Sequence, residues 1–242
     1  MNTRVLLFLF AAVGLSSAAA RANGPIEIIL PVDKVYVPSG FDDNDNIEVG
    51  LKGLFKSSCY KVSSSAAVVD HVARTITVTA TALEYSGACA DVVVPFLEVV
   101  KVGTLLQGDY TVVVAGRTAT GTVSVARRTT EAPDDYLYAP VQQAGIDQDS
   151  VTRRQTLHLT GRYPYCFIGC MKIREVKTYR SPADVLVVLP IADLIDGPEC
   201  EERQGNQDFD VKVPMQEPFN GEGMMHVRVL NGASLNRFLE IY

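Results

Sequence analysis

The stretch Cys59-Tyr60-Lys61-Val62 is followed by Cys89, and the same arrangement occurs again in the second half of the chain. There, Cys170-Met171-Lys172-Ile173 is followed by Cys200, with the same spacing between the two cysteines. Two pairs with equal spacing predict two small domains, each closed by its own disulfide, Cys59–Cys89 and Cys170–Cys200. In the chain-entropy account, a disulfide that closes a loop of this size contributes about 3–4 kcal/mol.

Other short stretches repeat in the same order in the two halves. Leu159-Thr160-Gly161 matches Leu51-Lys52-Gly53, and near the end of each half residues 227–232 match residues 111–116. The offset between the halves differs slightly from one match to the next. Offsets that drift by a few positions are typical of a duplicated domain with loop insertions, so we expect an internal repeat.

Short β-branched segments dominate both halves. Thr75 to Ala82 alternates threonine with apolar residues, which is the pattern of a half-buried strand. Segments 109–115 and 118–125 flank Gly116-Arg117, as in a β-hairpin. With about seven or eight such strands in the first half and a second half that repeats it, the sequence predicts an all-β protein made of two tandem antiparallel β-sandwich domains.

Residues 1–22 have the features of a cleaved secretory signal. Arg4 supplies a positive charge, and Val5 to Leu15 form an apolar run that is too short to span a membrane. Ala20-Arg21-Ala22 fits a cleavage site, with Ala18-Ala19-Ala20 as the alternative. The predicted organisation is a signal peptide at 1–22, a sandwich at 23–126, a charged linker at 127–135 and a second sandwich at 136–242.

Charge and export limit the classes of partner. The chain has 22 basic and 28 acidic residues, a net charge of −6, and loss of Arg4 and Arg21 with the signal makes the mature protein more acidic. We therefore expect no binding to nucleic acid or to anionic membrane surfaces. No long apolar run follows the signal, which predicts no transmembrane anchor. The expected location is the periplasm, the cell surface or the extracellular medium.

Cys166 is the cysteine that the repeat does not explain. An odd cysteine in an exported protein is typical of a free thiol or an intermolecular disulfide. The alternative pairing, Cys166 with Cys200, would leave Cys170 free, and the sequence does not decide between the two. We prefer Cys170–Cys200 because its spacing repeats that of the first pair. The spacing from Cys166 to Cys170 is not that of a thioredoxin-type redox motif.

One acidic loop has the composition of a calcium site. Its oxygen-bearing side chains are Asp42, Asp43, Asn44, Asp45, Asn46 and Glu48. Calcium takes several hard oxygen ligands, which closely spaced Asp, Asn and Glu side chains can supply. Residues 42–46 resemble the Asp-x-Asn-Asp-Asn linker pattern of cadherin repeats, and the resemblance implies a calcium ion bound at this loop. The other interpretation is a plain acidic turn.

No catalytic constellation is apparent in the sequence. His158 and His226 alternate with apolar neighbours in strand-like segments, so we expect both rings to face solvent. Together with Cys166 and Cys170 they have no standard zinc spacing. A nucleophile elbow and a phosphate-binding glycine loop are also missing. The sequence therefore predicts a protein that is not an enzyme and has no cofactor apart from the calcium considered above.

Residues 110–114 form a candidate interface. The alignment of residues 111–116 with residues 227–232 places Thr111 and Val113 in the core and turns Tyr110, Val112 and Val114 outward. Such an apolar stripe would contact a partner, the second domain or another copy. Alternatively, a neighbouring strand or the linker covers it.

The ending Gly108-Asp109-Tyr110-Thr111-Val112-Val113-Val114, followed by a hairpin, resembles the last strands of immunoglobulin-like and fibronectin-III-like domains. The resemblance implies tandem Ig-like sandwiches, although the chain lacks the tryptophan that antibody-type domains bury. We expect an exported, non-catalytic binding or structural module of the cell envelope or extracellular space, which acts through protein–protein contacts or self-association. The alternative is a calcium-dependent or carbohydrate-binding surface domain that uses the Asp42–Glu48 loop.

Overall fold

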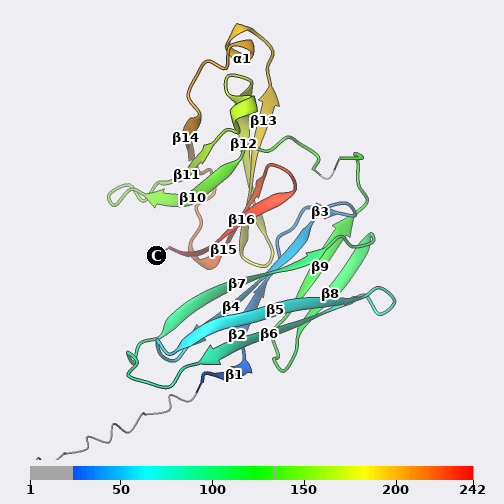
Figure 1. The fold of residues 1–242 in the computed structure, drawn as a ribbon, viewed down its shortest axis with the longest axis vertical. Coiled ribbons are helices and arrows are strands. Elements are labelled where there is room, and N and C mark those ends of the chain that lie inside the picture. Colours follow the sequence, from blue (N-terminus) through cyan, green and yellow to red (C-terminus); the bar gives the residue numbers. More distant parts are fainter. Residues whose placement is uncertain (1–23, 133, 242) are drawn as a thin grey trace, which may run out of the picture.

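The computed structural model describes residues 24–132 and 134–241, which form two β-sandwiches (Figure 1). The predicted signal peptide at 1–22 lies outside the described residues. The all-β fold class is confirmed, and within the described chain helix is confined to η1 (Tyr165–Phe167) and α1 (Pro198–Glu201). None of the helical segments described is long and apolar enough to cross a bilayer.

The N-terminal sandwich consists of a smaller and a larger sheet. The smaller sheet has the strand order β2-β4-β7, and the larger one has the order β1-β6-β8-β9-β3 with β5 on the other edge of β6. The strands are β1 (Ile26–Ile29), β2 (Val32–Tyr36), β3 (Phe41–Asp42), β4 (Ile47–Phe55), β5 (Tyr60–Asp70), β6 (Thr75–Glu84), β7 (Val94–Gly103), β8 (Gly108–Val114) and β9 (Thr120–Ala126).

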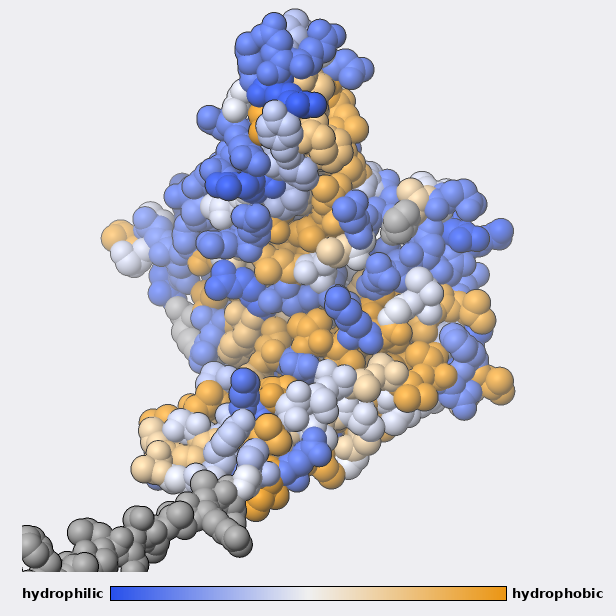
Figure 2. All heavy atoms as spheres, viewed as in Figure 1, coloured by the Kyte–Doolittle hydropathy of each residue, from blue (hydrophilic) through white to orange (hydrophobic). Residues whose placement is uncertain are grey.

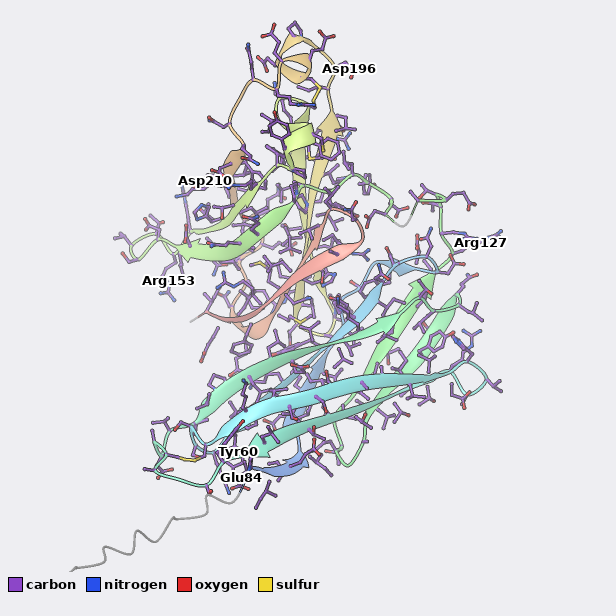
Figure 3. All side chains as sticks on the ribbon, viewed as in Figure 1. Tyr60, Glu84, Arg127, Arg153, Asp196 and Asp210 are labelled. Carbon is purple, nitrogen blue, oxygen red and sulfur yellow. A yellow bond between two sulfur atoms is a disulfide. The ribbon has the colours of Figure 1, made fainter. Side chains whose placement is uncertain are left out.

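The C-terminal sandwich repeats this strand order. Its smaller sheet is β10-β11-β14, which corresponds to β2-β4-β7, and its larger sheet is β12-β13-β15-β16, which corresponds to β5-β6-β8-β9. The strands are β10 (Val141–Gln148), β11 (Gln155–Arg162), β12 (Met171–Ser181), β13 (Val185–Leu194), β14 (Asp208–Pro214), β15 (Gly221–Val229) and β16 (Ala233–Ile241). The predicted linker, 127–135, lies between β9 and β10, and Arg127 at its start is labelled in Figure 3.

Irregularities in the ladders also occur at equivalent positions. The β5–β6 ladder has a bulge between Val62 and Ser64, and the β12–β13 ladder has one between Ile173 and Glu175, the same distance after the first cysteine of each pair. In both copies the second strand of this hairpin pairs in parallel with a later strand, β6 with β8 and β13 with β15. The expected antiparallel sandwiches therefore contain this parallel pair in each larger sheet, and the N-terminal sheet has a second one between β3 and β9. Because bulges are specific local features, their shared positions support duplication.

Tyr110, Val112 and Val114 lie in the N-terminal core with 1%, 0% and 1% of their surface exposed, so the predicted outward stripe is wrong. Thr111 lies beside the first residue of β6, and Met224 lies beside the first residue of β13. Thr111 therefore corresponds to Met224, whereas the sequence alignment matched it with Val227, three positions further along β15. A shift by an odd number of positions exchanges the two faces of a strand.

In the C-terminal sandwich, β13 is buried on both faces. Leu186 and Val188 face the interior of the sandwich, whereas Val185 and Val187 pack in a separate cluster with Tyr36 of the N-terminal domain. Burial on both faces explains the continuous apolar run at 185–189. The outer face of this sheet is therefore the surface that meets the other sandwich.

Candidate binding surfaces at the domain junction and the open flank

The two sandwiches are joined through packed sheet faces as well as through the linker. Tyr36 of β2 packs against Val185 and Val187 of β13 and Met224 of β15. Gly50 of β4 permits this approach, because a Cβ atom there would lie 2.5 Å from the sulfur of Met224. The apolar centre of the junction fixes how one sandwich sits on the other.

A buried ion pair crosses the same junction. Arg228 Nη1 of β15 donates to Asp45 Oδ1 at 2.6 Å, and the two side chains are only 8% and 7% exposed. Arg228 Nη2 donates to the carbonyl oxygen of Gly40 at 2.9 Å, and the guanidinium lies 4.7 Å from the ring centre of Phe41. Burial disfavours the charged guanidinium, but the hydrogen bond and charge of Asp45 outweigh burial and raise the pKa of Arg228. Loss of either partner would leave a buried, unpaired charge.

His226 is buried beside this ion pair, so the expectation that its ring faces solvent is wrong. Asn236 Nδ2 donates to Glu48 Oε2 at 2.8 Å, which leaves Asn236 Oδ1 to accept from His226 Nδ1 at 2.7 Å. Burial lowers the pKa of His226 to about 4, so the ring is neutral near pH 7. Alternation along β15 correctly predicts that His226 faces away from Met225 and Val227 of the core. The sequence does not reveal that the N-terminal domain covers this outer face of the larger sheet.

The acidic loop that resembles a calcium site lies at this junction, and its side chains have protein partners. Asp45 binds Arg228, and Glu48 accepts from both Ser234 and Asn236 of β16. Within the described residues, no group of three or more His, Cys, Asp or Glu side chains could hold a metal ion.

The rest of the loop contacts the linker and the C-terminal domain. Asn44 Nδ2 donates to the carbonyl oxygens of Thr130 and Ala132 at 3.2 and 2.9 Å, and the backbone N–H of Arg128 donates to Asp43 Oδ1 at 3.1 Å. Asn46 Nδ2 donates to the carbonyl oxygen of Gly232 at 3.2 Å, while burial raises the pKa of Asp42. These contacts give the loop a structural role at the domain junction.

Both preferred disulfides are formed. Cys59 is bonded to Cys89 and Cys170 to Cys200, so the alternative pairing through Cys166 is wrong. Cys166 is free and exposed in η1. The second disulfide joins the start of β12 to α1, near the labelled Asp196 in Figure 3.

His158 of β11 is partly exposed, as expected. Its Nε2 lies 2.9 Å from Asp210 Oδ1 on β14, and its Nδ1 lies 3.6 Å from Asp147 Oδ2 on β10. The ring therefore bridges two carboxylates across the outer face of the smaller sheet. The contact lies at the surface, and Asp210 is labelled in Figure 3.

The two sandwiches differ along one flank, where the edge strands of their sheets face each other. In the N-terminal sandwich, β5 and β7 lie side by side (Figure 1), and Ser65 Oγ donates to Glu98 Oε1 at 2.6 Å. Among the described residues, β12 and β14 show no comparable approach. They border a groove of about 710 Å³, which we call the open flank. Its floor and rims include Val176, Leu186, Val213, Phe219, Arg180 and Glu217.

Replacements on the inward face of β12 explain the opening. Counted from the shared bulge, Ala67 and Val69 of β5 correspond to Thr178 and Arg180 of β12. The first two pack against the N-terminal core, whereas the second two are exposed. Burying polar side chains between two sheets gains little free energy, so packing of β12 against β14 would not be stabilised as packing of β5 against β7 is.

The hydrogen bond that crosses the closed flank also has no counterpart in the C-terminal copy. Ser65 corresponds to Val176 in the same alignment of β5 with β12. Phe96 pairs with Gly53, and Phe209 pairs with the equivalent Gly161. Two residues further along each strand, Glu98 therefore corresponds to Val211. Two valines cannot form the hydrogen bond that joins β5 and β7 in the first copy.

Comparison with known proteins concerns the first copy alone. Residues 49–125 are similar to the ORF11 beta-sandwich domain. The ORF11 match starts in β4 and ends in β9, and it supports the sandwich architecture of the N-terminal domain. No curated protein and no solved structure matches the chain. The ORF11 match includes the closed flank, whereas the open flank lies outside it.

Sequence reasoning missed Arg180 and the floor of the open flank. A signal was present, because β12 contains Lys172, Arg174, Lys177 and Arg180 and the equivalent β5 has Lys61 as its basic residue. Comparison of the two copies strand by strand would have marked β12 as the strand that changed. The lack of closure itself required the three-dimensional arrangement.

Proposed function

We propose that the mature chain is an exported, non-catalytic binding module that acts through protein–protein contacts at the cell envelope or in the extracellular space. The observation that carries the proposal is the open flank. It offers an apolar floor and two unpaired strand edges on a body whose two sandwiches are fixed together by the domain junction. Grooves with apolar floors and a few polar groups are the surfaces that proteins use for binding.

Other features agree with a binding role. The two disulfides are compatible with export. At the end of the N-terminal sandwich away from α1, Tyr85, Val92 and Val93 are 43%, 52% and 64% exposed. Figure 2 has apolar residues over much of the visible N-terminal domain and hydrophilic residues around α1. Exposed apolar side chains of this kind are common at protein interfaces.

Lysine-directed cross-linking would test the proposal. The mature protein is incubated with envelope and culture-medium proteins, cross-linked, and analysed by mass spectrometry. We expect a saturable protein partner whose cross-links concentrate on Lys177 and Lys212, beside the open flank, with few on Lys61 and Lys101 of the closed flank.

Two controls make the result decisive. Cys166→Ser separates a covalent partner from a non-covalent one, because an intermolecular disulfide is lost in that variant. Cross-links spread equally over both flanks, or the lack of a saturable protein partner, would refute the proposed function.

A further inference from the structure

We infer that the open flank binds an extended segment of another protein, which joins β12 as an additional antiparallel or parallel strand and places an acidic side chain against Arg180. This inference rests on the proposed function and names the chemistry of the partner. It is carried by three observations: free strand edges, an apolar floor between them, and the charge of β12.

The edges of the open flank are free in both strands. β12 pairs with β13 alone and β14 with β11 alone, so in the described residues each has one edge without a strand partner. Unpaired N–H and C=O groups along an edge are a template for another strand. β12 is 11 residues long, which gives an incoming segment several main-chain hydrogen bonds.

The floor between these edges is apolar. Leu186 and Phe219 belong to the C-terminal core and are only 4% and 2% exposed, so the apolar surface open to an incoming strand comes mainly from Val176 and Val213, which are half-buried against that core. A strand that lies along β12 would direct every second side chain at this floor. The volume of about 710 Å³ suits a short segment with apolar residues at alternate positions.

Arg180 brings a positive charge to the groove. Its guanidinium lies 4.6 Å from the ring centre of Phe219, on the floor. It contacts Asp184 through Nη2 at 3.3 Å, while Asp184 is held more closely by Lys34 at 2.7 Å. A guanidinium that contacts its partner through one nitrogen can also bind a carboxylate of an incoming strand. Glu217 also lines the groove and would repel a carboxylate, so the preference for an acidic side chain is confined to the β12 side.

The basic residues of β12 also disfavour a second copy of this chain as the segment that binds the open flank. Within β12, four basic residues accompany a single acid, Glu175, although the chain as a whole has a net charge of −6. Pairing β12 with β12 of another copy would set like charges opposite each other, which destabilises a strand pair. A strand with acidic residues has the complementary charge.

A matched pair of peptides tests the inference on the purified, full mature chain. The probes are acetyl-Thr-Val-Glu-Val-Glu-Val-Thr-amide and the same peptide with lysine in place of each glutamate. We expect the acidic peptide to bind about tenfold or more tightly than the lysine peptide in calorimetric titration. Hydrogen exchange should slow in β12 on binding and stay unchanged in β5.

Variants connect the preference to one side chain. Arg180→Glu should reverse the preference, and Arg180→Gln should abolish it. Both change an exposed residue, and a circular dichroism spectrum and thermal melt confirm that each variant is folded. Lys61→Glu, on the equivalent strand of the closed flank, should leave both affinities unchanged.

Equal binding of the two peptides, no binding at millimolar concentration, or a binding event that leaves hydrogen exchange in β12 unchanged would overturn the inference. These outcomes are separable from failure of the proposed function. A protein partner cross-linked at Lys177 with no acidic-peptide binding would retain the binding function and refute strand addition.

Discussion

The β5–β7 flank of the N-terminal sandwich is closed, whereas the β12–β14 flank of the C-terminal sandwich is open, and both belong to copies with the same strand order and the same hairpin bulge. The closed flank has Ala67 and Val69 facing inward, and the open one has Thr178 and Arg180. A duplicated fold can therefore keep its topology while a few side chains decide which edge remains available. The second large difference is on the outer face of the larger sheet, which in the C-terminal copy carries the buried polar junction.

The largest expected effect concerns that outer face. At Arg228 the C-terminal copy has a buried ion pair where the N-terminal copy has Ala115. Arg228→Ala should lower the free energy of unfolding in urea by about 3–5 kcal/mol, because Asp45 would remain buried without its partner. Arg162→Ala, which removes an exposed pair with Asp208, should have a much smaller effect, and a similar loss in both variants would contradict a special role for the junction.

Each copy has one disulfide, and the two disulfides span the same number of residues. Replacing both cysteines of either pair with serine should reduce the free energy of unfolding by about 2–5 kcal/mol, with similar values for the two pairs because both have the same sequence separation. Denaturation curves of Cys59/Cys89 and Cys170/Cys200 double variants measure this. Cys166→Ser should leave stability unchanged, and a loss as large as that of a pair would mean that the free thiol has a structural role.

The pH dependence of stability should report burial of the outer face of β15. The pKa of His226 is lowered from 6.5 to about 4 in the folded protein, so the unfolded chain takes up the proton first as pH falls. The contribution of the neutral His226 ring to the free energy of unfolding is complete above pH 6.5. It is lost as the pH falls from 6.5 to about 4, and the loss amounts to roughly 3 kcal/mol.

The His226→Gln variant should show a weaker loss of stability than the parent over that pH range, measured by urea denaturation at a series of pH values. His158→Gln serves as the matched control for a partly exposed ring. If both variants followed the parent curve, His226 would not be the group that titrates.

Exchange of one side chain between the flanks tests why one is closed. Val69→Arg gives β5 the residue that β12 has at Arg180, and it should lower the free energy of unfolding by about 1–3 kcal/mol, because Val69 is half-buried against the core. The reciprocal Arg180→Val should change stability little, since its surroundings remain open. Equal effects on stability would show that these positions do not control closure.

Calcium should have the smallest effect. Asp45 and Glu48 already have protein partners, so millimolar calcium should not shift the thermal melting temperature relative to the same concentration of magnesium. A shift of several degrees that disappears in Asp43→Asn would instead restore the calcium hypothesis for the Asp42–Glu48 loop.

Much of the fold could be predicted because it depends on local patterns. Alternation in Thr75 to Ala82, the hairpin at Gly116-Arg117 and the equal cysteine spacings each reflect a short-range rule of strand geometry or chain closure. The outward stripe failed for the same physical reason that strand patterns work. With a side-chain period of two, an error of three positions in aligning β8 with β15 exchanged the two faces.

The sequence by itself determined the two β-sandwiches and one cysteine too many for pairing, and its repeated spacing favoured the disulfide pairing that the structure then decided. These follow from residues close in the chain or from spacings repeated along it. Only the tertiary structure decided that His226 and Arg228 are buried, that the acidic loop contacts the C-terminal domain, and that β12 and β14 leave a groove between them. Each of these depends on which sheet face or strand edge another part of the chain covers, and such long-range contacts leave no periodic signal in a single strand.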